Sequence, residues 1–346
     1  MRAFVYGGAG QSDWTEAPDP RVIDPTDVVI RVDTVTICGT DLHILAGDVP
    51  EVRPGRILGH EAVGTVMDAG AAVTTVRPGD RVLASCISAC GRCRFCRSGS
   101  YGQCTNGGGW VLGHLIDGVQ AEYARIPFAD LSTYPLPGNV TDETAVLLAD
   151  ILPTAYEVGV LNGQVGPGDT VVIVGMGPIG LAAVLAARLY SPARVIAVDK
   201  AENRLRAAER FGADVTLLSD QDPRAAVLAA TNGLGADVAL EAVGSPESFE
   251  LCTTLVRPVG RVANIGVHGK PATLHLEELW DRNLTITTGL VDTRTTAALL
   301  DMVSAGQFDP TPMITHRFAL DEIVRAYDVF SRAGETGALK VVMARP

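Results

Sequence analysis

Four cysteines stand close together in the sequence. Cys90, Cys93, Cys96 and Cys104 follow the spacing C-x2-C-x2-C-x7-C. Short loops with this spacing fold four thiolates around one tetrahedral metal ion, for which zinc is the usual choice in a reducing compartment. Because sulfur fills all four positions, the ion has no vacancy for a substrate, so we predict a structural zinc that holds a lobe at about residues 88–106. A redox CxxC pair with two unrelated cysteines is the alternative.

A glycine-rich turn follows a buried apolar run at Val171–Val174. It reads Gly175-Met176-Gly177-Pro178-Ile179-Gly180, and Asp199 ends the next apolar run. This spacing lets a pyrophosphate approach the backbone N–H groups at a helix N-terminus, whereas the alternative is a strand-to-helix turn without a nucleotide. Asp199 would accept hydrogen bonds from the adenosine ribose and repel a 2′-phosphate, which predicts NAD rather than NADP. The nearby cations Lys200 and Arg204 would partly neutralise such a phosphate and are counted among the coenzyme-binding residues.

A second group of metal-ligating residue types lies in the first third of the chain. The segments Cys38-Gly39-Thr40-Asp41-Leu42-His43 and Gly59-His60-Glu61 place a thiol, two imidazoles and two acids near the ends of expected strands. Taken singly, a buried cysteine is usually a small hydrophobe and a histidine is usually a hydrogen-bonded surface residue. The combination, however, is typical of a known family.

With these motifs the chain resembles the zinc-dependent medium-chain alcohol dehydrogenases along nearly its whole length. The resemblance implies that Cys38, His60 and Asp150 hold a catalytic zinc, that Glu61 lies at or behind the metal, and that Asp41 orients His60. The best-known members carry a cysteine at the position of Asp150. An acid there is similar to the bacterial secondary-alcohol dehydrogenase branch, although the NADP-using members of that branch lack the complete cysteine quartet and the acid at position 199.

The same resemblance assigns roles to further side chains. Thr40 and His43 would relay the proton, and Trp110 would form a bulky wall beside the substrate, with Leu290 as a neighbour. Lys340 is expected among the coenzyme contacts. A zinc ion with one open position is a Lewis acid that lowers the pKa of an alcohol, and NAD would take up the hydride.

Two kinds of pattern divide the chain. Up to about residue 150, short apolar runs broken by Gly, Pro and Asp predict an irregular β-rich domain, which in this family is GroES-like. Beyond it, strands alternate with helices, which predicts a doubly wound parallel (Rossmann) sheet and an α/β fold class. We predict a catalytic zinc-binding domain at 1–152 and 296–346, and a dinucleotide-binding domain at 153–295. The C-terminal part would add helices near 295–305 and 321–332 and a strand at 338–343 to the first domain.

Composition and charge exclude several classes of protein. The 346 residues suggest about two domains. With 28 Lys and Arg against 40 Asp and Glu, the formal charge of -12 repels phosphate backbones and anionic membranes, so nucleic acid and membranes are disfavoured as partners. The N-terminal residues lack the apolar core of a secretory signal, which leaves the cytoplasm as the expected location.

The combined expectation is an NAD-dependent zinc alcohol dehydrogenase with two zinc ions per subunit. It would interconvert a primary or secondary alcohol with its aldehyde or ketone, as a homo-oligomer in which a tetramer is favoured over a dimer. An NAD-dependent polyol or sugar dehydrogenase of the same family is the alternative. A zinc-free quinone or enoyl reductase would not need Cys38, His60 and Asp150 together, and a non-enzymatic zinc module would not need the dinucleotide fingerprint.

Overall fold

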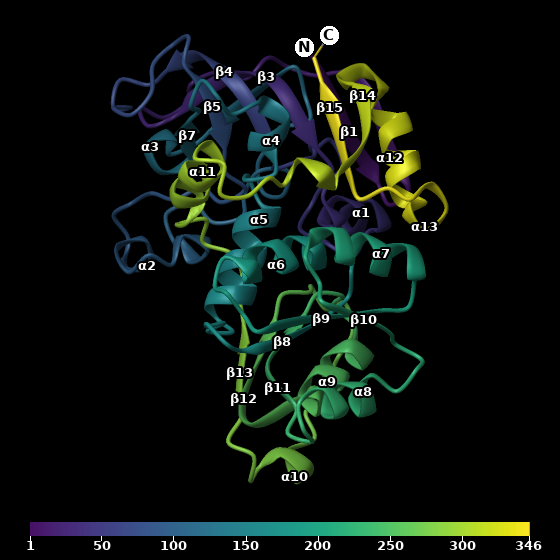
Figure 1. Ribbon diagram of the computed structural model, residues 1–346. Helices are drawn as coiled ribbons and strands as arrows, with labels where there is room; N and C mark the ends of the chain where they lie inside the picture. The colour runs from purple at the N-terminus through teal and green to yellow at the C-terminus, as the bar shows by residue number, and fades with distance from the viewer. Residues whose placement is uncertain (346) are drawn as a thin grey trace. The chain divides into compact units, whose positions relative to one another are not determined.

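The computed structural model describes residues 1–345 and divides into two compact units (Figure 1). Unit 1 comprises Met1–Pro153 and the chain from Val291 onward, and unit 2 comprises Thr154–Leu290. Unit 1 is built on a mixed sheet and unit 2 on a parallel sheet. The predicted α/β fold class, with a β-rich part and a doubly wound part, is confirmed.

Unit 1 contains a seven-stranded sheet and a separate two-stranded one. Along the larger sheet the order is β14 (Ile314–Ala319), β15 (Lys340–Ala344), β3 (Val28–Thr36), β4 (Ala62–Ala69), β5 (Arg81–Ala84) and β7 (Thr133–Pro135), while β6 (Tyr123–Ile126) also pairs with β3. The strands β1 (Arg2–Gly8) and β2 (Gln11–Glu16) form the antiparallel pair. Strand β3 lies centrally and is buried along most of its length, so residues at its end are held firmly.

Short helices surround this sheet. They are α1 (Gly39–Ala46), α2 (Arg94–Arg97), α3 (Ala129–Ser132), α4 (Asp142–Val146), α5 (Ile151–Thr154), α11 (Thr296–Ser304), α12 (Ile323–Ser331) and α13 (Ala333–Thr336). In α12 the buried residues Ile323, Ala326, Tyr327 and Phe330 recur at helical spacing and join the main core of unit 1. The ring of Tyr327 stacks on Phe4, with centroids 4.5 Å apart. Helix α12 thereby carries a hydroxyl into the interior.

Unit 2 is a six-stranded parallel sheet with helices on both faces. The strand order is β10 (Val215–Leu218), β9 (Arg194–Asp199), β8 (Thr170–Val174), β11 (Ala236–Glu241), β12 (Val256–Asn264) and β13 (Thr285–Thr288). Helices α6 (Pro178–Arg188) and α7 (Glu202–Phe211) lie on one face, and α8 (Pro223–Ala230) and α9 (Pro246–Leu255) lie on the other (Figure 1). A π-helical segment (Ala155–Leu161) and α10 (Leu276–Leu279) complete the unit. The order reverses between β8 and β11, where such sheets bind ligands.

One segment of unit 2 extends a strand where its residue types predict a turn. The residues Ser245-Pro246-Glu247 and Arg257-Pro258-Val259-Gly260 predict the start and stop of a helix, and α9 does end before the second segment, at Leu255, but β12 starts directly with Val256 and includes that segment. The segment 257–260 forms a bulge in β12: Val259 adopts a positive φ of 63°, and the pairing of β11 with β12 shifts register at its start. No helix among the described residues is long and apolar enough to cross a bilayer.

Candidate active site and metal centres

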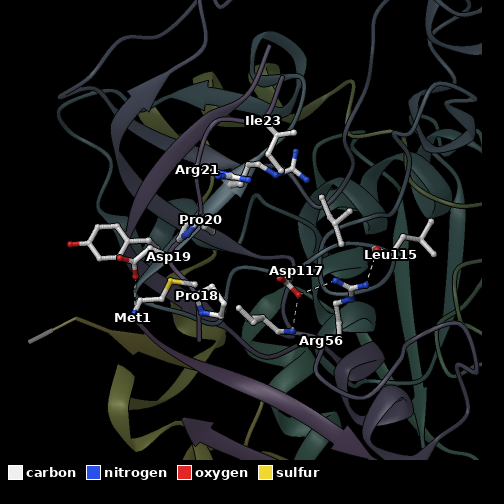
Figure 2. A pocket seen from close by; sticks show the side chains of 15 residues that line it. Met1, Pro18, Asp19, Pro20, Arg21, Ile23, Arg56, Leu115 and Asp117 are labelled. Carbon is white, nitrogen blue, oxygen red and sulfur yellow. Dashed lines mark hydrogen bonds and ion pairs between the residues drawn. The ribbon is translucent and has the colours of Figure 1, made fainter. Parts of the chain in front are cut away.

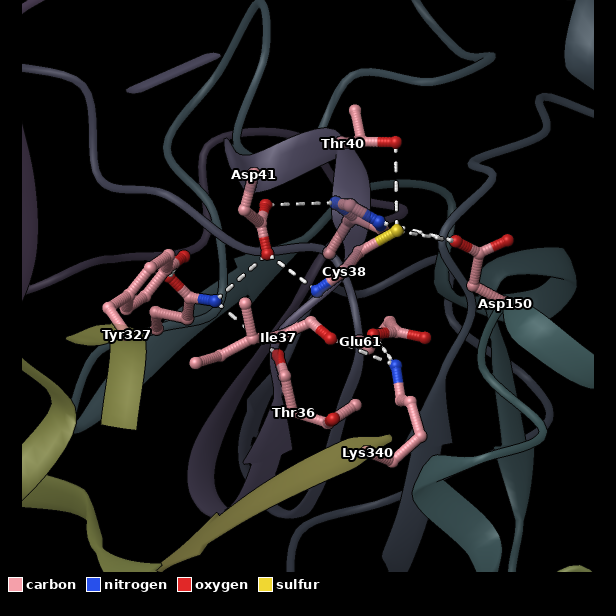
Figure 3. A network of polar contacts seen from close by, with 11 residues as sticks. Thr36, Ile37, Cys38, Thr40, Asp41, Glu61, Asp150, Tyr327 and Lys340 are labelled. Carbon is pink, nitrogen blue, oxygen red and sulfur yellow. Dashed lines mark hydrogen bonds and ion pairs between the residues drawn. The ribbon is translucent and has the colours of Figure 1, made fainter. Parts of the chain in front are cut away.

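Unit 1 brings Cys38, His60 and Asp150 together (Figure 3). Cys38 lies between β3 and α1, His60 directly before β4, and Asp150 directly before α5. The Cys38 Sγ lies 3.6 Å from Asp150 Oδ2, and His60 Nε2 lies 3.3 Å from the same oxygen. One donor atom from each residue lies within 4.8 Å of the other two.

These distances fit the coordination sphere of zinc. Ligand bonds of about 2.0–2.3 Å in a tetrahedron place the donor atoms about 3.3–3.8 Å apart. The two separations that involve Asp150 fall within this range at 3.3 and 3.6 Å. One thiol, one imidazole and one carboxylate form a mixed set that leaves a fourth position for an exchangeable ligand, which is the arrangement of catalytic zinc sites.

Burial and like charges make it unfavourable to hold these ligands in their charged forms without a cation. Burial raises the pKa of the Cys38 thiol and the nearby Asp150 carboxylate adds to that shift, although His60 opposes it. Burial, Asp150 and Glu61 likewise hold the pKa of Cys86 well above its ordinary value. Burial disfavours the charged form of His60, but Asp150, Asp41 and Cys38 outweigh that effect and raise its pKa. A divalent ion would offset this concentration of negative charge.

A buried ion-pair contact and a chain of hydrogen bonds support His60 and Cys38 through Asp41. Asp41 Oδ1 lies 3.6 Å from His60 Nδ1, which leaves Nε2 to face Asp150. The other oxygen of Asp41 accepts hydrogen bonds from the Cys38 backbone N–H at 3.0 Å and from Gln120 Nε2 at 3.2 Å. The Tyr327 hydroxyl donates to Gln120 Oε1 at 2.8 Å. Sequence reasoning missed Gln120 and Tyr327, because nothing local marks either residue as a neighbour of Asp41.

Glu61 and Lys340 form a buried ion pair beside this group (Figure 3). Lys340 Nζ donates to Glu61 Oε2 at 2.7 Å and to the Ile37 carbonyl at 3.1 Å. Burial alone would lower the pKa of Lys340, but the Glu61 carboxylate outweighs it and raises that pKa. The Lys340 side chain is 2% exposed and its ammonium is engaged with Glu61 inside unit 1, while its role as a coenzyme contact stays a prediction.

The two residues expected in the proton relay differ in their exposure. Thr40 Oγ1 lies 3.6 Å from Cys38 Sγ, next to the metal-ligand group. His43, one helical turn further along α1, is half exposed, and its Nδ1 lies 3.0 Å from Asp48 Oδ2. The Thr40 hydroxyl therefore lies beside the metal-ligand group, and the His43 imidazole reaches solvent.

The predicted substrate wall lies against the same group. The ring of Trp110 meets His60 edge to face, with centroids 6.4 Å apart and planes at 80°. Its other neighbour is His114, whose ring stacks on the indole at 4.2 Å and 18°. Leu290 is exposed and belongs to unit 2, and its place beside Trp110 stays a prediction. No local motif marks His114 as a neighbour of Trp110.

The four cysteines of the lobe also converge. One sulfur from each of Cys90, Cys93, Cys96 and Cys104 lies within 4.8 Å of the others, and Cys90 and Cys96 are 3.9 Å apart. Cys93 caps α2, where its sulfur accepts a hydrogen bond from the Cys96 backbone N–H at 3.4 Å. Backbone donors at Cys96 and Thr105 lower the pKa of Cys93 to about 5. A thiolate is the form that binds zinc, so Cys93 is ready to bind, whereas burial and the neighbouring Cys93 raise the pKa of Cys96 to about 12. A cation in the quartet would offset this shift and favour a closed four-sulfur site.

The glycine-rich turn of unit 2 has the close approaches that its spacing predicts. Gly175 has a positive φ of 97°, and a Cβ at Gly180 would lie 1.7 Å from the Gly175 carbonyl oxygen, so α6 packs directly on the turn. A Cβ at Gly177 would meet nothing within 4 Å. The turn is thus open where Gly177 precedes α6, and the first N–H groups of that helix are accessible to an anion.

Asp199 supports this turn from the end of β9. Its two carboxylate oxygens accept hydrogen bonds from the Met176 backbone N–H at 2.6 Å and the Ala201 backbone N–H at 2.8 Å. Arg204 Nη1 lies 4.0 Å from the carboxylate, and Lys200 is exposed. Each oxygen retains a lone pair for a further donor, such as a ribose hydroxyl.

A separate hollow of unit 1 does not include any of these site residues (Figure 2). Its charged groups are mostly paired internally: the Met1 ammonium lies 2.7 Å from Asp19, and Arg56 Nη1 lies 2.9 Å from Asp117. Arg56 Nη2 also donates to the Leu115 carbonyl at 2.9 Å. The arginine therefore braces the segment that follows His114.

Comparison with known proteins places the chain in a family. Residues 24–138 match the alcohol dehydrogenase GroES-like domain, and residues 178–305 match the zinc-binding dehydrogenase domain. An alcohol dehydrogenase from Cupriavidus necator is 35% identical over 99% of this chain and 98% of its own length. The chain belongs to the zinc-dependent medium-chain alcohol dehydrogenases. This identification confirms the family inferred from the sequence.

Solved structures of alcohol dehydrogenases support the same conclusion. A zinc-dependent alcohol dehydrogenase from Streptococcus pneumonia superimposes with a TM-score of 0.95 at 45% identity, covering 100% of this chain and 98% of its own. A zinc-binding dehydrogenase from Sinorhizobium meliloti, solved with bound NADP, has a TM-score of 0.86 at 29% identity and covers 99% and 98% of the two chains. The protein is accordingly an oxidoreductase of the zinc and pyridine-nucleotide class.

Proposed function

We propose that the protein is an NAD-dependent alcohol dehydrogenase that interconverts primary or secondary alcohols with aldehydes or ketones. The observation that carries this proposal is the convergence of Cys38, His60 and Asp150 with donor separations that suit a three-ligand zinc. A closed site would suit a structural ion, whereas three protein ligands leave room for a substrate oxygen. The four-cysteine lobe would hold the second zinc of each subunit.

Different residues of unit 1 would bind the metal and transfer the proton. Cys38, His60 and Asp150 would hold a zinc ion that would polarise the alcohol oxygen as a Lewis acid, and bound NAD would be the hydride acceptor. Thr40, next to Cys38, is placed to accept the alcohol proton, and the half-exposed His43 is placed to release it to water. In carbonyl reduction the same groups return a proton to the oxygen.

The coenzyme preference rests on Asp199. Its buried carboxylate already binds two backbone N–H groups of unit 2, so it stays in position and presents a fixed negative charge to any 2′-phosphate. A repulsion of a few kcal/mol corresponds to a roughly hundredfold preference for NAD over NADP. Arg204, 4.0 Å from the carboxylate, limits rather than abolishes this discrimination.

Replacement of Asp199 tests the coenzyme assignment. Asp199→Ser should narrow the gap between NAD and NADP in kcat/KM, because the charge that opposes the phosphate is lost. Asp199→Asn is the matched control, since it keeps the shape and one acceptor oxygen but removes the charge, and it should narrow the gap in the same direction. A wild-type preference for NADP would overturn the role given to Asp199.

The substrate class is tested by a direct assay. A panel of primary alcohols, secondary alcohols, ketones and polyols with NAD should give its highest kcat/KM on small or medium monoalcohols or their carbonyl partners, because Trp110 lies beside His60 as an apolar wall. A polyol as the best substrate would favour the sugar or polyol dehydrogenase alternative. The zinc content of the same preparation should be two ions per chain.

We further propose a homo-oligomer, with a tetramer favoured over a dimer, in the cytoplasm. Unit 2 exposes large apolar side chains, among them Trp280 at 77% and Leu276 at 60%, which a second copy would cover. The use of cysteines as metal ligands suits a reducing compartment. Sedimentation of the purified protein distinguishes a tetramer from a dimer or monomer.

A further inference from the structure

We propose that His114 is a positioning residue that holds the indole of Trp110 beside His60 and thereby sets the size of substrate that the enzyme accepts. This inference rests on the proposed function, because it takes Trp110 as the wall of the substrate site. His114 belongs to none of the sequence motifs described above.

The first argument is the contact itself. The imidazole of His114 lies nearly parallel to the indole, with centroids 4.2 Å apart and planes at 18°, while the indole meets His60 at 80° on a separate contact. Trp110 is therefore placed between two imidazoles. A flat ring held by stacking on one side and an edge contact on another has little freedom to turn.

The second argument is that His114 is itself held in one orientation. Its Nδ1 lies 3.0 Å from the carbonyl oxygen of Trp110. A carbonyl only accepts, so Nδ1 carries the hydrogen and the ring plane is set by the backbone of the residue on which it stacks. The other nitrogen, Nε2, is buried and makes no hydrogen bond among the described residues. The ring thus contributes shape rather than a polar contact at that edge.

The third argument is that the segment 109–118 is fixed at both ends. At its start, Gly109 and Ser88 exchange backbone hydrogen bonds of 2.6 and 3.0 Å. At its end, Gly118 N–H donates to the Ile57 carbonyl at 2.9 Å, and Arg56 holds the Leu115 carbonyl (Figure 2). Residues 110–114 therefore cannot shift as a body, and a change in the Trp110 ring must come from its side chain.

Glycine contacts tie the same segment to the residue next to His60. A Cβ at Gly113 would lie 2.8 Å from the backbone N and O of Gly59, and one at Gly118 would lie 2.2 Å from Gly59 O. These approaches are possible only without side chains. The distance from the Trp110 backbone to His60 is consequently set by the fold, and His114 decides where the indole lies within the remaining space.

Three substitutions separate the ring from the hydrogen bond. His114→Ala removes both, His114→Asn keeps a short donor without a ring, and His114→Phe keeps a ring that can stack without the donor. The phenyl group costs no hydrogen bond at the position of Nε2, because that atom has none. We expect His114→Phe to behave as wild type and the other two variants to behave alike.

The first readout follows the tryptophan directly. The chain has 3 Trp, so Trp14→Phe and Trp280→Phe leave Trp110 as the sole emitter. In that background, time-resolved fluorescence anisotropy should show fast local motion of Trp110 in His114→Ala and His114→Asn, but not in His114→Phe. Equal anisotropy in all four proteins would overturn the positioning role, whether or not the protein oxidises alcohols.

The second readout is substrate selection. The ratio of kcat/KM for 2-propanol to that for a bulky secondary alcohol should fall about tenfold in His114→Ala, as expected when an apolar wall is loosened. The change should come mainly from a higher KM for 2-propanol, since the wall contacts the ground state and the transition state alike. Mobile Trp110 with an unchanged ratio would overturn the specificity role. No turnover of any alcohol by wild type, with the anisotropy effect intact, would instead mark failure of the proposed function.

Discussion

The two metal-ligand sets of unit 1 are held in place by different parts of the chain. In the lobe, the four ligands come from fifteen consecutive residues, 90–104, and backbone N–H groups donate to sulfur, as at Cys93 and Cys96. Around Cys38, His60 and Asp150, the support comes from side chains: Tyr327 and Gln120 form hydrogen bonds in series to Asp41, and Asp41 lies 3.6 Å from His60 Nδ1. Where the backbone supports a site, substitutions change its metal affinity chiefly when they replace a ligand. Where side chains support a site, substitutions of those side chains can also change its metal affinity.

The largest effect should follow from removal of a ligand in the mixed set. Asp150→Asn should reduce the zinc content from two ions to one per chain and lower kcat/KM by about a thousandfold or more, since a catalytic metal supplies several kcal/mol of transition-state stabilisation. NAD binding, measured by calorimetry, should persist. Asp142→Asn, which changes an acid on the neighbouring helix α4, is the control and should keep both ions. Full activity with two zinc ions in Asp150→Asn would refute the ligand assignment.

Loss of a ligand in the lobe should damage stability more than chemistry. Cys93→Ser should also remove one zinc ion, and the lobe should lose several kcal/mol of local stability because metal binding contributes directly to the folding of a structural site. Hydrogen exchange of residues 90–104 and the midpoint of thermal unfolding measure this change. Cys252→Ala, in unit 2, is the cysteine control and should retain both ions. A Cys93→Ser protein with two ions and unaltered heat resistance would mean that the lobe holds no metal.

A substitution of Asp41 should lower the zinc affinity of the Cys38, His60 and Asp150 site although no ligand is replaced. Asp41→Asn keeps the volume of the side chain but removes the charge that faces His60 Nδ1. Loss of such a supporting carboxylate typically lowers metal affinity or activity 10- to 100-fold, so roughly that decrease is expected in competition with a zinc chelator. The lobe zinc of the same protein serves as the internal control. Unchanged affinity would show that the fold alone orients His60.

The smallest effect should come from Tyr327, which is two hydrogen bonds away from Asp41 and one contact further from the ligands. Tyr327→Phe leaves the stacking on Phe4 but removes the hydrogen bond to Gln120 Oε1. An unsatisfied buried acceptor costs about 1–3 kcal/mol, so the free energy of unfolding should fall by that amount while zinc affinity changes less than in Asp41→Asn. Denaturant titration and chelator competition measure the two quantities. If Tyr327→Phe lost more zinc affinity than Asp41→Asn, the conclusion that Asp41 supports the ligands more directly than Tyr327 would be contradicted.

The same contrast explains what the sequence could predict. The cysteine quartet is local, so spacing alone predicted its convergence, and the strand, turn and helix around Gly175 were predicted from patterns within thirty residues. Cys38, His60 and Asp150 come from three distant segments, and only the family resemblance joined them. The ion pair between Glu61 and Lys340 was missed because it depends on β15 pairing with β3, a contact without a local signal.

The residues that mark helix ends in unit 2 show which features have a local signal and which do not. Helix α7 stops at its C-cap, Gly212, where a glycine at positive φ is a strong local stop signal that the sequence shows. Asp222 and Pro223 at the start of α8 are a similar local signal for a helix cap. The segment 257–260 follows the end of a helix as its Pro and Gly predict, but it forms the bulged start of a strand, which depends on pairing with β11 and has no local signal.

The ion pair between Lys340 and Glu61 also bears on how the protein is made. The two residues are 279 positions apart, and the whole of unit 2 is translated between them. Domains generally fold as units while the chain emerges from the ribosome, so unit 2 can fold before β15 is available to pair with the Thr34–Thr36 end of β3. During that interval this end of β3 lacks its neighbouring strand, and Glu61 lacks the counter-charge of Lys340. A chaperone that covers the unpaired end of β3 would therefore act on the nascent chain until Lys340 has been made.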